Sequence, residues 1–238
     1  MKILYPDKIS SITASEAATD YPPTNLADNY TTNLWKGTSA TATPLITLSV
    51  AGDSDVVALF NTNATSVDIL VKKSTGATVS NTHYTVDSDL PNIWAEYTSQ
   101  VTTHTIEITF NGPSGAVTEC GVIRAGKSNT FLDPQKGLHE SLKDLSVIVD
   151  SRGSTYYKKR ALIRMFSGQI DTIRDNDFYT FLYTIMKNTG RTPLAWKIVT
   201  EFTSQKWTIF AWIVTGFPSG VHSLFNVSTI SFSLQEGI

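Results

Sequence analysis

The sequence predicts a mainly β protein in two parts: an N-terminal all-β sandwich or barrel and a C-terminal α+β module with one amphipathic helix packed on an antiparallel sheet. Three observations lead to this fold class. Up to about residue 125, short segments alternate apolar and polar residues between turn-forming clusters. One stretch, residues 173–190, repeats its apolar residues at helical spacing. Near the C-terminus, residues 229–235 alternate again, as expected of a half-buried strand.

Residues that favour turns separate the predicted strands of the first part. The segments with alternating apolar positions are LITLSV (45–50), DVVALFN (55–61), SVDILVKK (66–73), HYTVD (83–87), HTIEITF (104–110) and GVIR (121–124). Glycine, aspartate, asparagine or proline occupies the turns AGDSD, KSTGA and NGPSGA between them. Short strands with such turns predict an all-β sandwich or barrel.

The second part is predicted to begin with a long hairpin, residues 145–166, that turns at DSRG (150–153). The helix follows, and its apolar stripe consists of Phe178, Phe181, Leu182, Ile185 and Met186. We expect Asp175 or Asp177 to cap its start and Gly190 to end it. LAWKIV (194–199), KWTIFAWIV (206–214) and TISFSLQ (229–235) are predicted to form the sheet beneath the helix.

These patterns divide the chain into residues 1–126, a linker over 127–137, and residues 138–238. Hydrophobic residues make up 41% of the 238 residues and charged residues 17%, with a formal net charge of −2. Such a surface has no basic field for nucleic acid or an anionic membrane, so we expect neither nucleic-acid readout nor membrane insertion. The start of the sequence has no long apolar run, and we expect a protein made in a cytoplasm without a signal peptide.

Residues 121–128, GVIRAGKS, match the phosphate-binding pattern G-x-x-x-x-G-K-[ST]. The pattern requires a helix that begins at Lys127, yet Pro134 and Gly137 leave too few residues for two helical turns. The stretch before Gly121 also lacks the continuous apolar run of a buried parallel strand. We therefore interpret these residues as an edge β-strand that runs into a linker, and we expect no nucleotide hydrolase.

The remaining reactive residues do not form a recognisable catalytic or metal-binding pattern, so we expect no enzyme activity, cofactor or metal. The four histidines are scattered: His83, His104, His139 and His222. Cys120, the single cysteine, excludes an intramolecular disulfide and is expected to be a buried thiol. An aromatic strand and turn is expected in core packing or a subunit interface, with a sugar platform as the other interpretation; it contains Trp207, Phe210, Trp212 and Phe217.

The first part contains YPPTNLADNYTTNLWKG (21–37), DVVALFNTNATSVDILV (55–71) and ECGVIRAG (119–126). These phrases resemble the discoidin-like (coagulation factor type C-like) jelly roll. The resemblance implies that Asn25 and Asp28 hold the early loop by side-chain-to-backbone bonds and that Trp35 closes the end of the barrel. Sugar-binding relatives can hold calcium in this loop, but Asn29 replaces the expected glycine after Asp28, which argues against a metal site here.

Both parts in this order are similar to tail-tip (baseplate) proteins of long-tailed, siphovirus-like bacteriophages, of the distal-tail or minor tail protein type. The phrase DLSV (144–147), the helix at 177–188 and SFSLQEG near the C-terminus resemble their ring-forming module. The resemblance implies a structural virion component that forms a closed ring, a hexamer or trimer, and joins the tail tube to the distal tip proteins. The hairpin at 145–166 would reach the next subunit by strand addition.

The alternative is a carbohydrate-binding module that recognises host-surface glycan through the N-terminal jelly roll. Such a module needs exposed aromatic side chains in loops of the first part. The candidate glycan contacts are Trp94 and Tyr97, together with Tyr30.

Overall fold

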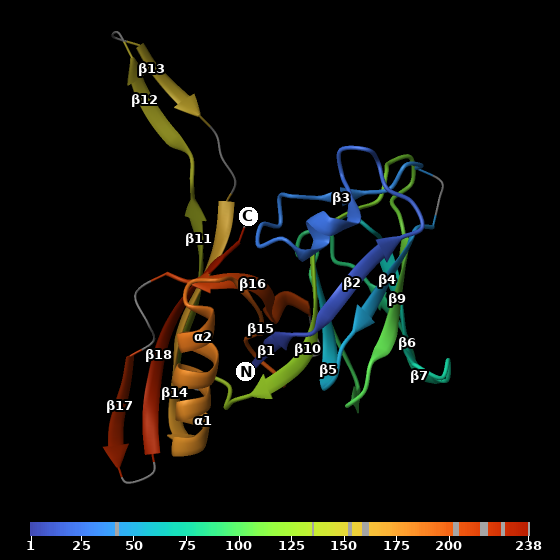
Figure 1. Ribbon diagram of the computed structural model, residues 1–238. Coiled ribbons are helices and arrows are strands. Elements are labelled where there is room, and N and C mark those ends of the chain that lie inside the picture. Colours follow the sequence, from blue (N-terminus) through green and yellow to red (C-terminus); the bar gives the residue numbers. More distant parts are fainter. Residues whose placement is uncertain are drawn as a thin grey trace. The chain divides into compact units, whose positions relative to one another are not determined.

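The computed structural model describes residues 1–40, 43–134, 136–151, 154–158, 162–201, 205–214, 219–224 and 227–237. The protein is mainly β with antiparallel strand pairs, which confirms the predicted fold class. The chain forms two compact units (Figure 1). Unit 1 contains Met1–Phe131 and Leu194–Phe210, and unit 2 contains Leu132–Pro193 and Ala211–Ile238.

Unit 1 is a sandwich of two sheets. Its strands are β1 (Lys2–Asp7), β2 (Ile9–Ala14), β3 (Trp35–Lys36), β4 (Leu45–Val50), β5 (Ser54–Thr62), β6 (Ser66–Lys73), β7 (Thr78–Thr85), β8 (Ile93–Gln100), β9 (His104–Asn111), β10 (Glu119–Thr130) and β15 (Leu194–Lys197). One sheet has the order β15-β1-β10-β5-β8, with β3 paired to part of β10, and the other has the order β2-β4-β9-β6-β7. Two short 3₁₀ turns, η1 (Pro23–Ala27) and η3 (Gln205–Trp207), complete the unit.

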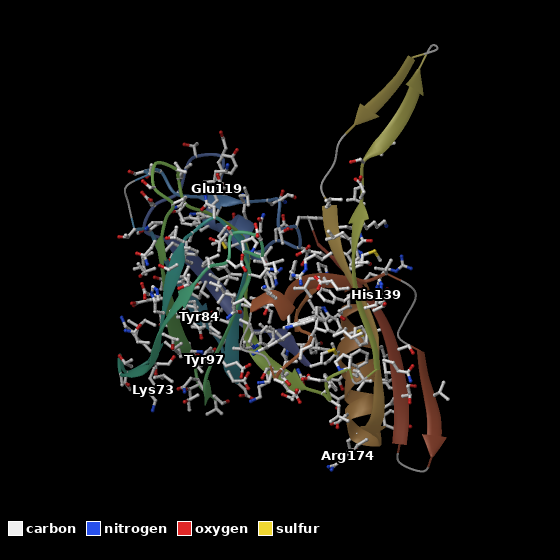
Figure 2. All side chains as sticks on the ribbon, turned by 180° about the vertical axis from the view of Figure 1, so that it is seen from behind. Lys73, Tyr84, Tyr97, Glu119, His139 and Arg174 are labelled. Atoms are coloured by element: carbon white, nitrogen blue, oxygen red, sulfur yellow. The ribbon has the colours of Figure 1, made fainter. Side chains whose placement is uncertain are left out.

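Strict alternation along β4, β6 and β9 places their apolar side chains between the two sheets, as the sequence predicts. The core that results contains Trp35, Ile46, Ile69 and Phe110, and partly buried side chains such as Tyr84 and Tyr97 pack against it (Figure 2). A second cluster covers the opposite face of the β15-β1-β10-β5-β8 sheet. Its members are Leu4, Val56, Ala58, Phe60, Trp94, Val122, Ala195 and Phe210.

Unit 2 is an α+β module. β11 (Lys136–Asp144) pairs with β14 (Leu162–Arg174), and β14 pairs with β18 (Val227–Glu236). β17 (Ser219–Leu224) and residues 211–213 of β16 (Thr208–Ile213) share the other edge of β18. The pairing of the predicted hairpin is confirmed, because β12 (Val147–Ser151) pairs with β13 (Ser154–Lys158) in a separate two-stranded sheet. Residues 152 and 153 of its predicted turn lie outside the described residues.

The predicted helix is also confirmed and runs through α1 (Asp175–Tyr179), the π-helical segment η2 (Thr180–Met186) and α2 (Lys187–Thr189). It packs on β14 and β18 (Figure 1), and its buried side chains are Phe178, Phe181, Ile185 and Met186. Gly190 ends it with a positive φ, as expected. The expected aspartate cap is wrong, because Arg174 occupies the N-cap position and makes no side-chain capping bond.

Two boundaries differ from those expected from the sequence. β10 continues through Gly126 to Thr130 and pairs with β1 there, so the first residues of the predicted linker belong to the sandwich. Residues 194–210, expected in the second part, belong to unit 1, where β15 pairs with β1. The chain therefore contributes an early and a late segment to the same sandwich.

Candidate functional site

The residues that match the phosphate-binding pattern form part of β10, a strand within the sheet rather than at its edge. β10 pairs with β5 on one side and with β1 and β3 on the other. The expectation of an edge strand is therefore wrong. The strand continues through Lys127 and Ser128, so no helix begins there to receive phosphate.

Close backbone contacts explain the two glycines of the pattern. A Cβ at Gly121 would lie 2.3 Å from the Thr31 carbonyl oxygen, and one at Gly126 would lie 2.1 Å from the Pro6 carbonyl oxygen. A side chain at either position would collide with another strand or loop. Both glycines therefore serve strand packing.

The lysine of the pattern is held by carboxylates. Lys127 Nζ lies 3.2 Å from Asp53 Oδ1 and 3.2 Å from Asp55 Oδ2. Ser99 Oγ also donates to Asp53 Oδ1 at 3.0 Å. These contacts engage the amine that a phosphate loop would offer to its ligand.

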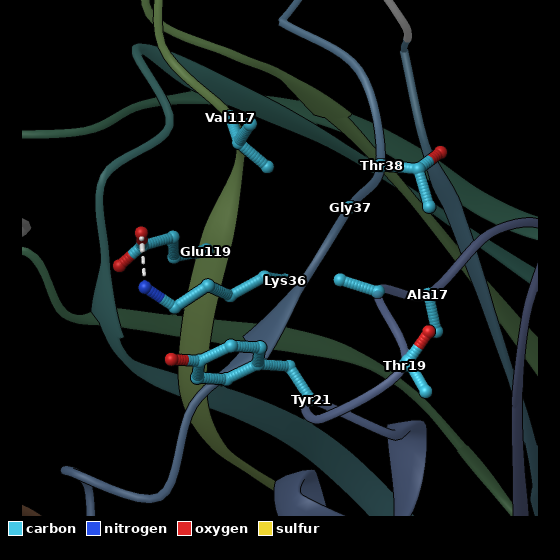
Figure 3. Close-up of a pocket in the computed structure, with 9 residues that line it drawn as sticks. Ala17, Thr19, Tyr21, Lys36, Gly37, Thr38, Val117 and Glu119 are labelled. Atoms are coloured by element: carbon cyan, nitrogen blue, oxygen red, sulfur yellow. Dashed lines mark hydrogen bonds and ion pairs between the residues drawn. The ribbon is translucent and has the colours of Figure 1, made fainter.

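An open depression of about 500 Å³ on unit 1 is a candidate binding site (Figure 3). Tyr21, Lys36 and Glu119 form its polar part. Small residues form the rest: Ala17, Ala18, Thr19, Gly37, Thr38 and Val117. Its size falls in the range of about 300–1,000 Å³ that small-molecule sites occupy.

Strand pairing places the two charged residues of the depression next to each other. In the β3–β10 pair, Lys36 lies directly opposite Glu119, and Trp35 lies opposite Cys120. Because successive side chains of a strand point to opposite faces, the fully buried Trp35 holds Lys36 toward solvent. The backbone N–H of Ala18 donates to the Lys36 carbonyl oxygen at 3.0 Å, which ties the loop that leads to Tyr21 to the same strand.

The polar part of the depression is preorganised. Lys36 Nζ donates to Glu119 Oε1 at 2.8 Å and lies 4.5 Å from the centre of the Tyr21 ring (Figure 3). The hydrogen bond to Glu119 raises the pKa of Lys36 above its ordinary value of 10.5. The Tyr21 side chain remains partly exposed. An aromatic ring, a donor and an acceptor are therefore held in fixed positions around an accessible depression.

A second carboxylate, that of Glu16, lies behind Gly37. Thr38 Oγ1 donates to Glu16 Oε2, and the Trp35 indole N–H donates to the Glu16 backbone carbonyl oxygen at 3.2 Å. Glu16 Oε1 is buried and has no hydrogen-bond partner in the described part of the chain. A Cβ at Gly37 would lie 2.7 Å from that oxygen. A side chain at position 37 would therefore displace the end of the Glu16 side chain.

The loop with the predicted structural residues lies beyond Tyr21 and includes η1. Asn25 Nδ2 donates to the Leu34 carbonyl oxygen at 2.8 Å. Asp28 Oδ1 accepts from the backbone N–H of Asn29 at 2.6 Å, and Asp28 Oδ2 accepts from Asn33. Trp35 is buried against Phe110. The loop is thus tied by side-chain bonds at both of its ends.

Arg124, a further residue of the GVIRAGKS stretch, holds the same loop to β10. Its guanidinium donates to the carbonyl oxygens of Leu26 at 3.3 Å and Asp28 at 2.6 Å. The ring of Phe210 lies 5.2 Å from Arg124 Cζ. Burial lowers the pKa of the guanidinium, whereas nearby Asp7 and Asp28 raise it. Arg124 therefore has a structural role, in which it joins the loop to β10 by hydrogen bonds.

The predicted glycan contacts do not coincide with this depression. Trp94 is 3% exposed and belongs to the second apolar cluster of unit 1, so the expectation that it is an exposed glycan contact is wrong. Tyr97 packs on the core, and burial raises the pKa of its hydroxyl. Tyr30 is exposed but does not line the depression.

The predicted interface residues fall into three groups. Phe210 is buried against Phe60, with 5.2 Å between ring centres, so it belongs to core packing, one of the two expected uses, and not to an interface surface. Trp207 and Trp212 are partly exposed, and their use as an interface stays a prediction. Phe217 lies outside the described residues.

Buried hydrogen bonds account for His104. Its Nε2 lies 2.9 Å from Ser54 Oγ and 3.2 Å from the Tyr97 hydroxyl, and its Nδ1 lies 3.0 Å from the Thr102 carbonyl oxygen. The contacts join β9 of one sheet to β5 and β8 of the other. Because His104 and Ser54 are almost inaccessible to solvent, the arrangement offers no nucleophile to a substrate.

The other reactive groups are held in strands. His83 Nδ1 contacts Asp68 Oδ1 at 2.8 Å on the exposed face of β6 and β7. Burial raises the pKa of the Cys120 thiol to about 12, which makes it unreactive. In the described part of the chain, no group of three His, Cys, Asp or Glu side chains is arranged to hold a metal ion, and no helix is long and apolar enough to cross a membrane.

Sequence reasoning missed Tyr21, Lys36 and Glu119 as a group. The only local signal was the position of Lys36 directly after a tryptophan that was expected to be buried. Its partner Glu119 lies 83 residues away in the sequence, and only the register of β3 on β10 brings the two together.

No protein-family model matches the sequence, and no curated protein matches it. Several solved structures are similar to about half of the chain. A GH29 fucosidase of Ruminococcus gnavus is 17% identical with a TM-score of 0.42, and the match covers 50% of this chain but 25% of the fucosidase.

Two smaller structures are matched over most of their length. The lectin domain of lectinolysin, solved with Lewis B antigen, is 9% identical with a TM-score of 0.43, and the match covers 50% of this chain and 93% of the domain. The Clostridium perfringens protein CpGH89CBM32-4 is 15% identical with a TM-score of 0.39, and the match covers 51% of this chain and 99% of that protein. Likenesses at this level do not bear on what the present chain binds.

Proposed function

We propose that unit 1 is a carbohydrate-binding module and that the depression around Tyr21, Lys36 and Glu119 is its glycan site. One observation carries the proposal: an exposed aromatic ring lies beside a fixed donor and a fixed acceptor in a depression of suitable volume. The apolar face of a sugar ring packs on an aromatic side chain, and its hydroxyl groups bond to charged donors and acceptors. The small residues Ala17, Ala18 and Gly37 leave space for the sugar.

A glycan microarray followed by titration calorimetry tests this proposal. We expect Tyr21→Ala to weaken binding about tenfold, because an aromatic contact contributes about 1.5 kcal/mol and 1.4 kcal/mol corresponds to a factor of ten. Tyr30→Ala is the matched control, since Tyr30 is an exposed tyrosine of the same unit outside the depression. Binding that is lost with Tyr30→Ala and kept with Tyr21→Ala would place the site elsewhere, and absence of glycan binding would refute the proposal.

We propose for unit 2 a role in self-assembly, as a structural component of a bacteriophage tail tip. The support is the β12–β13 hairpin, whose strands pair with each other and with no other described strand. Free strand edges are templates for strand addition by another chain. A second copy of this chain is the partner that a closed ring requires.

The mass of the purified protein in solution, measured by light scattering over a range of concentrations, tests the assembly role. We expect an oligomer for the whole chain. We expect a smaller species when Asn-Gly replaces Val147–Lys158, because that change removes both strands of the hairpin and leaves a short connection between β11 and β14. A monomer at every concentration, or an oligomer that survives the replacement, would contradict this role for the hairpin.

A further inference from the structure

β7 lies at an edge of the β2-β4-β9-β6-β7 sheet, and no described strand pairs with its outer side. Its sequence, TVSNTHYT, contains no lysine, arginine, carboxylate or proline, the residues that commonly protect such an edge from other chains. One register shift lies near the start of β7, opposite Val71 and Lys72, and leaves Ser80–Thr85 regular. This regular stretch is therefore a template for strand addition.

The hydrogen bonds of the sheet show which backbone groups of β7 point to its outer side. The backbone N–H of Val86 donates to the Thr65 carbonyl oxygen at 3.0 Å, which continues the register of β7 on β6. Because the bonds of an antiparallel pair involve every second residue, the even-numbered residues of β7 bond to β6 and the odd-numbered residues point outward. The N–H of Phe110 donates to the Pro44 carbonyl oxygen at 3.0 Å, which gives the same assignment when the alternation is followed through β9 and β6. The outward residues of the regular stretch are Asn81, His83 and Thr85.

Two other sheet edges show the protection that β7 lacks. At the edge formed by β8, the Trp94 backbone N–H donates to the Gln205 side-chain oxygen at 2.8 Å. At the edge formed by β11, the sequence contains the charged residues Glu140, Lys143 and Asp144. Charged residues on an edge strand oppose the addition of another strand. Of these three edges, β7 is therefore the best acceptor.

The β12–β13 hairpin has the complementary need. Its two strands pair with each other in a separate two-stranded sheet. An isolated hairpin of two strands is at best marginally stable in water, and a third strand stabilises it. Each strand of the hairpin has five residues, so either one fits along Ser80–Thr85 of β7. The chain therefore contains both an edge that can accept a strand and a hairpin that needs a third strand.

We infer that one strand of the β12–β13 hairpin adds to the outer edge of β7 in a second copy of this chain. The inference rests on the proposed self-assembly and names the acceptor of the hairpin. Donor and acceptor are different surfaces, so each copy gives its hairpin to one neighbour and receives a hairpin from another. Such head-to-tail contacts generate a ring when the rotation between copies closes.

A proline at an outward N–H tests the acceptor edge. Asn81→Pro removes an N–H that β6 does not use and places the proline ring toward the added strand, so β7 keeps its bonds to β6. Asn81→Ala is the matched control, because it removes the same side chain and keeps the N–H. By light scattering, we expect the concentration at which half of the chain is assembled to rise at least about tenfold in Asn81→Pro. The same concentration should change less than about twofold in Asn81→Ala.

A second pair of variants repeats the comparison at another outward N–H. His83→Pro and His83→Ala both remove the hydrogen bond between His83 and Asp68, and only the alanine variant keeps the N–H. We expect His83→Pro to raise the assembly concentration as Asn81→Pro does, and His83→Ala to change it less than about twofold. Circular dichroism and a thermal melt verify that each variant is folded.

A mixing experiment tests whether the hairpin and β7 act in different copies. Asn81→Pro keeps the hairpin and loses the acceptor edge, whereas the chain with Asn-Gly in place of Val147–Lys158 keeps β7 and loses the hairpin. Each variant should be a monomer by itself. When mixed, the two should form a one-to-one dimer that does not grow, because a single donor and a single acceptor remain.

The outcomes separate this inference from the proposed self-assembly. If the hairpin replacement dissociates the oligomer while Asn81→Pro and His83→Pro leave it intact, the hairpin assembles through another acceptor and the inference about β7 is wrong. Absence of the mixed dimer also overturns the inference. A parent chain that is monomeric at every concentration refutes both proposals.

Discussion

Phe210→Ala provides the sharpest test of the unexpected return of residues 194–210 to unit 1. Phe210 is 1% exposed and lies against Phe60, with 5.2 Å between ring centres, and against the Arg124 guanidinium. Removing a buried phenylalanine ring costs about 3–5 kcal/mol, which combines the lost burial with the cavity that remains. We expect the free energy of unfolding to fall by about 4 kcal/mol in Phe210→Ala, because the substitution also removes the contacts of the ring with an aromatic ring and with a cation.

Such a loss is a large share of the stability of a typical domain, which is about 5–15 kcal/mol. Urea unfolding followed by tryptophan fluorescence should report it, since Trp94 belongs to the same apolar cluster as Phe210. Two units need not unfold together, so amide hydrogen exchange should be measured as well. We expect faster exchange in β5 and β10 of the variant, because these strands supply the neighbours of Phe210.

Tyr183→Ala is the control for this experiment. Tyr183 is an aromatic residue that is 57% exposed on the helix of unit 2, so its removal should change stability by no more than about 0.5 kcal/mol. A loss below about 1 kcal/mol for Phe210→Ala would show that residues 194–210 do not pack in the sandwich. The division of the chain into these two units would then be refuted.

Two further predictions concern unit 1. Gly126→Ala should lower the free energy of unfolding by at least about 2 kcal/mol, because the added Cβ would collide with the Pro6 carbonyl oxygen. Thr78→Ala is the control, because Thr78 is exposed on β7 and its substitution should leave the thermal midpoint nearly unchanged. The hydrogen bond to His83 lowers the pKa of Asp68 below its ordinary value of 3.8. The ionised carboxylate therefore contributes stability above pH 3.8 that is lost as the pH falls through the lowered pKa. Asp68→Asn should reduce that acid-induced loss slightly, and an identical pH profile of the melting temperature in both proteins would contradict this role.

Local patterns succeeded where one face of a strand is buried and the other is solvated. β4 and β6 begin and end where the alternation of apolar residues predicted. The sequence predicted the helix equally well, because only one face of the helix is apolar and packs on a sheet. In these elements the period of the sequence and the environment of the side chains agree.

The same reasoning failed where apolar residues cover both faces of a sheet. β8 begins with the buried residues Ile93, Trp94 and Ala95, so it shows no alternation and was not predicted. Buried Trp94 was for the same reason expected in an exposed loop. In β10, Gly121 and Gly126 leave room for neighbouring backbone. Their spacing matches the phosphate-loop pattern, although the strand lies within a sheet.

The amino-acid sequence by itself determined the mainly β class, the amphipathic helix and the hairpin of this protein, because each depends on periodicity over a few consecutive residues. Only the tertiary structure decided that residues 194–210 join the first sandwich and that Lys36 lies opposite Glu119 beside Tyr21. Both depend on which distant strands pair and in which register. Many pairings satisfy the same local pattern, and the packing of the whole chain selects one of them.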